Sequence, residues 1–144
     1  MRRASAFVLD IPQNAENVVI SESILDALSF REIDENVGII ALTGATKTRQ
    51  VKDYLAKHKE QFADKHLLIA MDDDQAGWKA TRDIVNTIEE DGVGENWSVF
   101  DYTSETKDAN ENLQQNRKAF TKTYNQMAAR TKQHERVMAI EHEP

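Results

Sequence analysis

Three short, unbroken runs of apolar residues most constrain what this chain can fold into. They occupy residues 18–20, 38–42 and 67–71, and none of them alternates with polar residues. Strands of this kind are buried on both faces, as the strands of a parallel sheet are. Residues 97–102 alternate in polarity and predict a fourth strand. Residues 5–9 are a candidate edge strand.

Between these runs, apolar residues recur at helical spacing. The helical segments are 23–33, 46–62 and 76–91. The first segment carries its apolar residues at Ile24, Ala27 and Leu28, and Gly92 is a plausible stop for the third. Strands that alternate with helices of this length predict right-handed βαβ crossovers. We therefore expect an α/β fold: a doubly wound parallel sheet of about four strands with flanking helices.

The last third of the chain reads differently. Residues 103–112 predict a polar loop, and a helical stretch follows with one apolar face made by Leu113, Phe120, Tyr124 and Met127. We expect three parts: an N-terminal extension over 1–16 that holds the possible edge strand, a domain over 17–127, and a polar tail over 128–144. The tail is expected to fray or to link the domain to a larger polypeptide.

Composition excludes several classes of protein. The 144 residues fit one domain. No apolar run approaches the roughly 18 to 20 residues of a membrane helix, and the N-terminus lacks a signal-peptide pattern, so we expect a cytoplasmic protein without a membrane partner. With no cysteine there is no disulfide, thiolate nucleophile or Cys-ligated zinc, and the four histidines lack metal-ligand spacing.

The formal net charge of −7 limits how this chain meets nucleic acid. Proteins that grip nucleic acid alone present a basic surface, because phosphate neutralisation supplies most non-specific affinity. We therefore expect the chain alone to bind nucleic acid weakly. The grip has to come from a local basic patch, a metal bridge or other domains of a larger protein.

Acidic residues follow the predicted strands, at the edge where an open parallel sheet binds its ligands. Glu22 follows the first strand with Asp26 one helical turn later, Asp72 and Asp74 follow the third, and Asp108 comes a few residues after the fourth. Carboxylates this close repel one another unless a cation or shared protons neutralise them. Oxygen ligands alone favour Mg²⁺, Mn²⁺ or Ca²⁺ over zinc or copper.

Each of these acids has a simpler interpretation when it is taken alone. Asp74 fits the N-cap of the third helix, Asp108 with Glu111 fits a capping box, and Glu22 fits a solvated loop. The convergence of three strand exits on one edge favours a metal site over these separate roles.

Basic and aromatic residues near the same edge are the remaining candidates. Lys47, Lys79 and Lys107 are candidate phosphate contacts, although isolated surface lysines are usually only solvated. Residues 43–47 are not a P-loop, because the spacing of that motif is missing. Trp78 and Trp97 are expected to be core or sheet-covering aromatics rather than base-stacking platforms.

The acidic segments resemble the motifs of Toprim domains. Residues 18–28 are similar to the first Toprim motif, a strand that ends in glutamate with an aspartate four residues later. Residues 69–80 resemble the DxD motif in the D-x-D-x-A-G-x-x-A form of bacterial primases, and 107–111 resemble the later acidic motif of the primase-like branch. The resemblance covers roughly residues 17–113 and keeps the motif order.

The resemblance implies a role for each acid. Glu22 would be a metal ligand or general acid/base, Asp72 and Asp74 would hold Mg²⁺ (or Mn²⁺), and Asp26 and Asp108 would be secondary acids around the metal. The sequence departs from the family pattern twice. Ser23 stands where the family usually has glycine, and Asn110 stands where primase-like members carry a further acid, which predicts a weaker or missing second metal.

The implied function is Mg²⁺-dependent phosphodiester chemistry on nucleic acid. The chain would be the catalytic Toprim module, a primase-like nucleotidyltransferase or nuclease, of a larger replication or mobilisation protein of plasmids and mobile elements. A non-catalytic Toprim scaffold in a repair or replication complex is the alternative. A phosphoacceptor receiver domain is disfavoured, because its acid pair should follow the first strand rather than the third.

Overall fold

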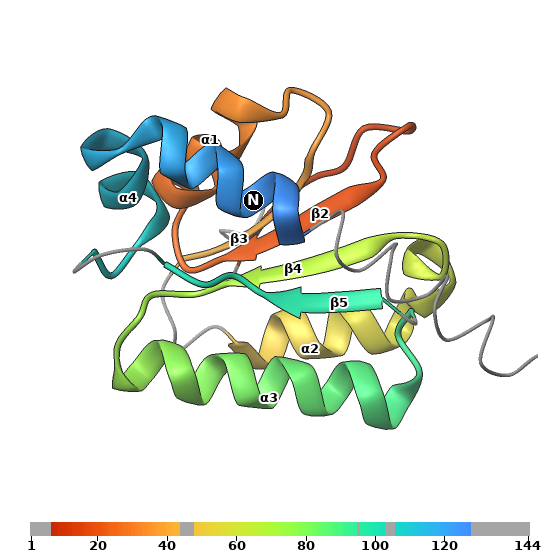
Figure 1. The fold of residues 1–144 in the computed structure, drawn as a ribbon. Coiled ribbons are helices and arrows are strands. Elements are labelled where there is room, and N and C mark those ends of the chain that lie inside the picture. Colours follow the sequence, from red (N-terminus) through yellow and green to blue (C-terminus); the bar gives the residue numbers. More distant parts are fainter. Residues whose placement is uncertain (1–6, 44–47, 95, 103–105, 128–144) are drawn as a thin grey trace, which may run out of the picture.

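A five-stranded sheet forms the centre of the structure, a computed structural model that describes residues 7–43, 48–94, 96–102 and 106–127 (Figure 1). Its strands are β1 (Phe7–Asp10), β2 (Asn17–Ser21), β3 (Gly38–Leu42), β4 (His66–Ala70) and β5 (Asn96–Val99). Their order is β1-β3-β2-β4-β5; β1 pairs antiparallel with β3, and the other pairs are parallel. The expected α/β fold is confirmed, and the candidate edge strand is present as β1.

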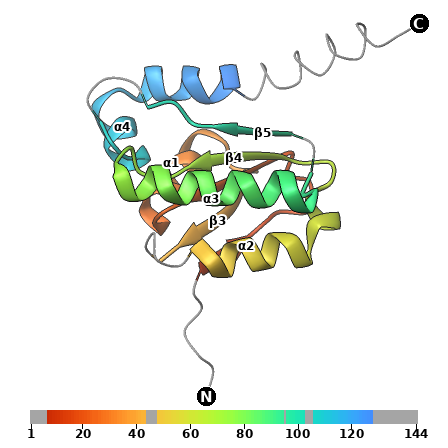
Figure 2. The same cartoon turned by 90° about the horizontal axis from the view of Figure 1, so that it is seen from below.

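Helices cover both faces of this sheet (Figures 1 and 2). The helices are α1 (Ile24–Ile33), α2 (Thr48–Lys57), the short 3-10 helix η2 (Lys59–Phe62), α3 (Gln75–Asp91), α4 (Ala109–Gln115) and the helical residues 117–127. α2 and α3 lie on one face, while α1, α4 and residues 117–127 lie on the other. The single helix expected after residue 112 is two helices, because the backbone of Asn116 is non-helical and ends α4.

Two cores explain why the strands are apolar without alternation. Val18 and Ile20 of β2 pack toward α2 and α3, whereas Val19 between them packs toward α1 and residues 117–127. Phe30, Phe100 and Phe120 form an aromatic cluster in the second core, with ring centroids 4.9 to 5.3 Å apart. Each central strand is thus buried on both faces, as the sequence predicts.

The buried face of α1 differs from the face suggested by its apolar spacing. Ala27 and Phe30 are fully buried, but Ile24 and Leu28 are 45% and 46% exposed. Ala27 packs with Ile39 and Ala41 of β3. The helix therefore turns its small residues and Phe30 to the sheet and leaves larger aliphatic side chains at the surface.

α1 and α3 begin just beyond the ends of β2 and β4, and α4 begins further along the chain after β5; each of the three has a side-chain cap. Ser23 caps α1, Asp74 caps α3 and Asp108 caps α4; each accepts a hydrogen bond from the backbone N–H three residues later. The caps and the acids of interest thus share the carboxyl edge of the parallel strands. The segment 44–47 and the tail 128–144 lie outside the described residues. Within the described chain, no helix is both long and apolar enough to cross a membrane.

Candidate metal centre

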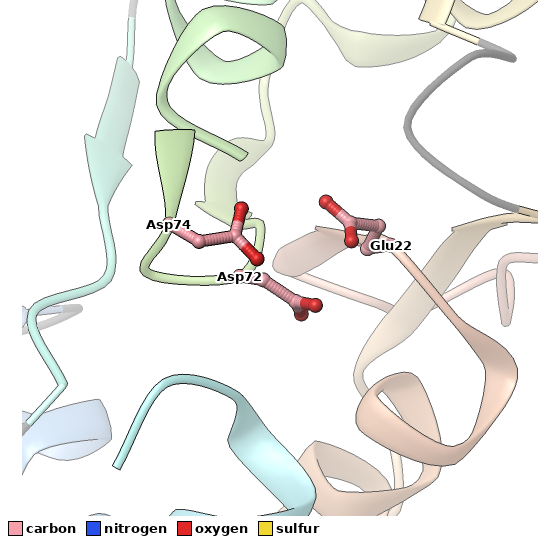
Figure 3. Close-up of side chains that lie close together, drawn as sticks. All are labelled: Glu22, Asp72 and Asp74. Atoms are coloured by element: carbon pink, nitrogen blue, oxygen red, sulfur yellow. The ribbon is translucent and has the colours of Figure 1, made fainter. Parts of the chain in front are cut away.

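Glu22, Asp72 and Asp74 lie together at the carboxyl edge of the sheet (Figure 3). One carboxylate oxygen from each lies within 4.8 Å of the others. The sheet register explains this: Ser21 at the end of β2 pairs with Ala70 at the end of β4, so both chains leave the sheet at the same level. The proximity expected from the strand exits is therefore present in the fold.

Asp74 both caps α3 and belongs to this group. Its Oδ1 accepts a hydrogen bond from the backbone N–H of Gly77 at 2.8 Å, which leaves its other oxygen for a ligand. The cap holds the carboxylate in one orientation at the positive end of a 17-residue helix. Capping and ligand binding are thus compatible roles for this side chain, not competing ones.

Gly77 fixes the loop that carries the two aspartates. A Cβ at this position would lie 1.9 Å from the carbonyl oxygen of Asp72 and 2.8 Å from its carbonyl carbon. Only glycine lets the first turn of α3 pack this closely on the backbone of Asp72. The glycine of the DxDxxG segment therefore serves the chain's own loop.

A second set of contacts ties the same loop to the segment before α4. The backbone N–H of Asp73 donates to the carbonyl oxygen of Lys107 at 2.5 Å. The carboxylate of Asp73 turns away and accepts the indole N–H of Trp78 at 2.7 Å. The middle aspartate thus braces the loop while its two neighbours face the centre.

Burial raises the pKa values of two of the three acids. It is the main cause that brings the pKa of Asp72 to about 7, and the hydrogen bond and charge of Glu22 add to it. Burial also raises the pKa of Glu22, partly offset by its hydrogen bond with Asp72. The charge of Asp74 raises both pKa values. Without a cation, burial and mutual repulsion therefore disfavour the charged forms of both Glu22 and Asp72.

Two oxygen atoms of this pair fit a bound cation. Glu22 Oε1 and Asp72 Oδ1 are buried and, among the described residues, have no hydrogen-bond partner. Leaving a buried acceptor unsatisfied costs about 1–3 kcal/mol, and the cost is higher when the group is charged. An all-oxygen donor set with unmet acceptors suits Mg²⁺ or Mn²⁺. The residues present therefore fit the metal that the sequence suggests.

Asp26 lies outside the group of three and connects α1 to α4. It is only 5% exposed; Oδ1 accepts the backbone N–H of Asn110 at 3.0 Å, and Oδ2 accepts the hydroxyl of Ser23 at 2.9 Å. Burial raises its pKa to about 6 despite these hydrogen bonds. Ser23, which replaces the usual family glycine, thus supplies both a helix cap and a hydrogen bond to Asp26.

Asp108 also lies outside the group of three. Its Oδ1 accepts the backbone N–H of Glu111 at 2.8 Å, which is the N-cap expected from the sequence. Its charge still raises the pKa values of Asp26 and Asp72, so its carboxylate faces the same region.

The three candidate phosphate-binding lysines do not lie together in one place as the three acids do. Lys47 lies outside the described residues, and Lys107 meets the loop through its backbone. Lys79 lines a groove of about 500 Å³ between α2 and α3 together with Arg49 and Lys52. In the part of the chain that the structure describes, none of these three groove cations forms an ion pair.

Two further hollows share Asp72 of the carboxylate group. One, of about 480 Å³, is lined by Glu22 and Asp72 and extends along the start of α1. The other, of about 560 Å³, also reaches Asp72 and runs between α3 and β5. Trp78 lines this second hollow and is 60% exposed, so the expectation that it is a core aromatic is wrong. Trp97 packs against the core, as expected.

Comparisons with known proteins support the same assignment of fold. A family model described as Toprim-like matches residues 19–113. The crystal structure of the primase fragment of the bacteriophage T7 primase-helicase protein is similar, with a TM-score of 0.61 and 20% identity over 79% of this chain and 44% of that chain. No curated protein matches the chain.

A second bacteriophage T7 structure shows the lagging-strand DNA polymerase interacting with primase domains bound to an RNA/DNA hybrid and dTTP. It is similar with a TM-score of 0.54 and 24% identity, over 78% of this chain and 54% of that chain. This chain thus spans about half the length of the solved chains that it matches. At these identities the similarity shows a shared fold.

Proposed function

The chain belongs to the Toprim-like family, and from that premise we propose that it carries out Mg²⁺-dependent phosphodiester chemistry on nucleic acid. The reaction is nucleotidyl transfer, as in primases, or strand cleavage. The chain acts as the Toprim module of a larger replication or mobilisation protein, whose other domains supply most of the grip on nucleic acid. The observation that carries this proposal is the carboxylate group, two of whose buried oxygens have no hydrogen-bond partner among the described residues.

Each acid has a distinct role in this proposal. Asp72 and Asp74 hold Mg²⁺, for which Mn²⁺ substitutes, and Glu22 is a further ligand or the general acid/base. The bound ion supplies charge neutralisation and polarisation at the phosphoryl oxygens. As the base, Glu22 accepts the proton of an attacking hydroxyl in transfer or of water in cleavage. Asp26 and Asp108 act as secondary acids; their charges already reach Asp72 or Glu22.

Basic residues beside the centre position the phosphate backbone. Lys79 lines the groove between α2 and α3, and the proposal places a phosphate of the substrate there, with Lys47 and Lys107 as further contacts. The grip of these few cations stays weak because the chain as a whole carries a net charge of −7.

One assay covers both reaction classes. A 5′-labelled single-stranded oligonucleotide is incubated with the chain, nucleoside triphosphates and Mg²⁺ or Mn²⁺, and the products are separated on a denaturing gel. Longer products report transfer and shorter products report cleavage. We expect turnover by the parent chain and a loss of at least about 100-fold in Glu22→Gln and Asp74→Asn, since removing an electrostatic group from a reaction centre costs about that much.

The control is Asp91→Asn, which removes an exposed acid at the far end of α3. It should leave turnover unchanged. Equal loss in all three variants, or turnover that persists without a divalent ion, would contradict the proposal. A parent chain that binds partner domains but forms neither longer nor shorter products would point instead to a non-catalytic Toprim scaffold.

A further inference from the structure

Trp78 is held in a fixed position at the surface, beside the carboxylate centre. It lies in the first turn of α3, four residues after Asp74, and 60% of its surface is exposed. Its indole N–H donates to Asp73 Oδ1 at 2.7 Å, and Asp73 is itself braced by Lys107. An exposed indole that is hydrogen-bonded to the metal loop is oriented rather than free to rotate.

The hollow next to Trp78 leads from the carboxylates along the edge of the sheet. Trp78, Arg82 and Val85 line it from α3, at helical spacing, and Trp97 and Val99 line it from β5. α3 and β5 run side by side at this edge (Figure 1). Asp72 lines this hollow and also the hollow at Glu22, so the two hollows adjoin at the carboxylate centre.

We propose that Trp78 is a base-stacking platform for single-stranded nucleic acid whose phosphate lies at the carboxylate centre. This inference rests on the proposed function and adds a binding residue to it. The rise of an α-helix places Trp78 about 6 Å along α3 from Asp74, so a nucleotide held at the acids has its base beside the indole. Every base has a π-face, so such a platform binds without sequence preference.

Arg82 supplies the cation that such a strand needs. It lies one helical turn beyond Trp78 in the same hollow. Among the described residues it forms no ion pair, so its guanidinium is available to the next phosphate. The three features match three parts of a strand. The fixed ring of Trp78 faces a base, Arg82 one turn away faces a backbone phosphate, and the acids face a metal-bound phosphate.

The test uses the fluorescence of Trp78 itself. The chain has two tryptophans, so Trp97→Phe leaves Trp78 as the single reporter. We titrate this variant with an eight-residue oligothymidylate in Mg²⁺ and follow indole emission. Stacking of a base should quench the emission of Trp78 with a midpoint equal to the dissociation constant from anisotropy of the labelled oligonucleotide.

Affinity measurements on three variants complete the test. Trp78→Ala should weaken oligonucleotide binding about 5- to 150-fold, the range measured when a stacking aromatic is replaced by alanine. Trp78→Phe keeps an aromatic face and should retain most of the affinity, and Asp91→Asn, at the exposed far end of α3, should match the parent chain. Because the Trp78 side chain is exposed, thermal melts of Trp78→Ala and Trp78→Phe should coincide with that of the parent chain.

The possible outcomes separate this inference from the proposed function. Mg²⁺-dependent binding that is lost in Asp74→Asn but unchanged in Trp78→Ala, without quenching, overturns the stacking platform and leaves the proposed function standing. Quenching and loss of affinity in Trp78→Ala that ignore Mg²⁺ and Asp74 support the platform and count against the proposed function. No oligonucleotide binding overturns the platform, whereas the proposed function, which assigns most of the grip to other domains, is then decided by the turnover assay. Trp78 emission that changes with protein concentration alone overturns the inference in favour of contact between two copies.

Discussion

Gly77→Ala should disable the carboxylate centre without unfolding the chain. The added Cβ would lie 1.9 Å from the carbonyl oxygen of Asp72, whereas Cβ atoms essentially never approach other atoms closer than 3.0 Å. The first turn of α3 and the Asp72 backbone must therefore separate by about 1 Å. Overpacking of this kind costs about 1–3 kcal/mol. Alanine returns at most about 1 kcal/mol of helix propensity. The net loss of stability is thus about 0–2 kcal/mol.

The same 1 Å displacement matters more for metal binding. Mg²⁺ requires near-ideal geometry at about 2.0–2.1 Å from its ligands, so moving Asp72 relative to Asp74 removes a favourable ligand position. We expect the affinity for Mg²⁺ to fall about 10- to 100-fold, as it does when residues that orient metal ligands are changed. The assay is thermal unfolding followed by circular dichroism across a titration of MgCl₂, at constant ionic strength.

Gly92→Ala is the matched control. Gly92 ends α3 in the left-handed conformation at φ 69°, and no atom lies within 4 Å of a Cβ placed there. Alanine in that conformation costs about 1–2 kcal/mol, so this variant should lose stability but keep the full response to Mg²⁺. A Gly77→Ala chain that binds Mg²⁺ like the parent, or a Gly92→Ala chain that loses the response, would refute the reasoning.

Three further predictions concern the response to Mg²⁺, the response to pH and the binding of single-stranded DNA. With millimolar affinity, 10 mM Mg²⁺ should add about 1.4 kcal/mol to the free energy of unfolding, about 2–6 °C in melting temperature; Asp74→Asn, which keeps a helix cap, should respond only as it does to sodium. Without metal, the urea midpoint of unfolding should fall between pH 5 and pH 8, and this fall should be smaller in Asp72→Asn. The raised pKa values of Asp72 (about 7) and Asp26 (about 6) give stability that is complete below about pH 4 and is lost as the pH rises through 6–7. In fluorescence anisotropy at about 150 mM salt, single-stranded DNA should bind no tighter than about 10⁻⁶ M; a nanomolar complex would contradict the charge argument.

The sequence predicted the carboxylate group because parallel topology dictates it. Strands that run in the same direction end at one edge, so residues that directly follow them meet there. Glu22 and Asp72 follow neighbouring strands whose last residues pair in register. The alternation of strand and helix, visible in the apolar pattern, predicts the shared edge, whereas the strand order β1-β3-β2-β4-β5 that makes β2 and β4 neighbours is not visible in that pattern. The proximity of these acids thus needed no side-chain detail.

Other features depended on packing that a pattern does not encode. The rotation of α1 is set by Ala27 against β3, so Ile24 and Leu28 are exposed although their spacing fits a buried face. Trp78 is exposed and donates a hydrogen bond to Asp73, and no residue pattern reveals either feature. The steric role of Gly77 likewise appears only when the distance from its position to Asp72 is known.

Direct measurement of Mn²⁺ binding tests the central claim, that Glu22, Asp72 and Asp74 form one divalent metal site. The electron paramagnetic resonance signal of free Mn²⁺ falls as the ion binds, so a titration gives stoichiometry and affinity without any nucleic acid. We expect the parent chain and Asp91→Asn to bind Mn²⁺ alike, and Mg²⁺ to compete for the same site. Glu22→Gln, Asp72→Asn and Asp74→Asn should each bind at least about tenfold more weakly, because each loses a charged oxygen ligand. Equal Mn²⁺ binding by all of these chains would show that the three acids are not a metal site.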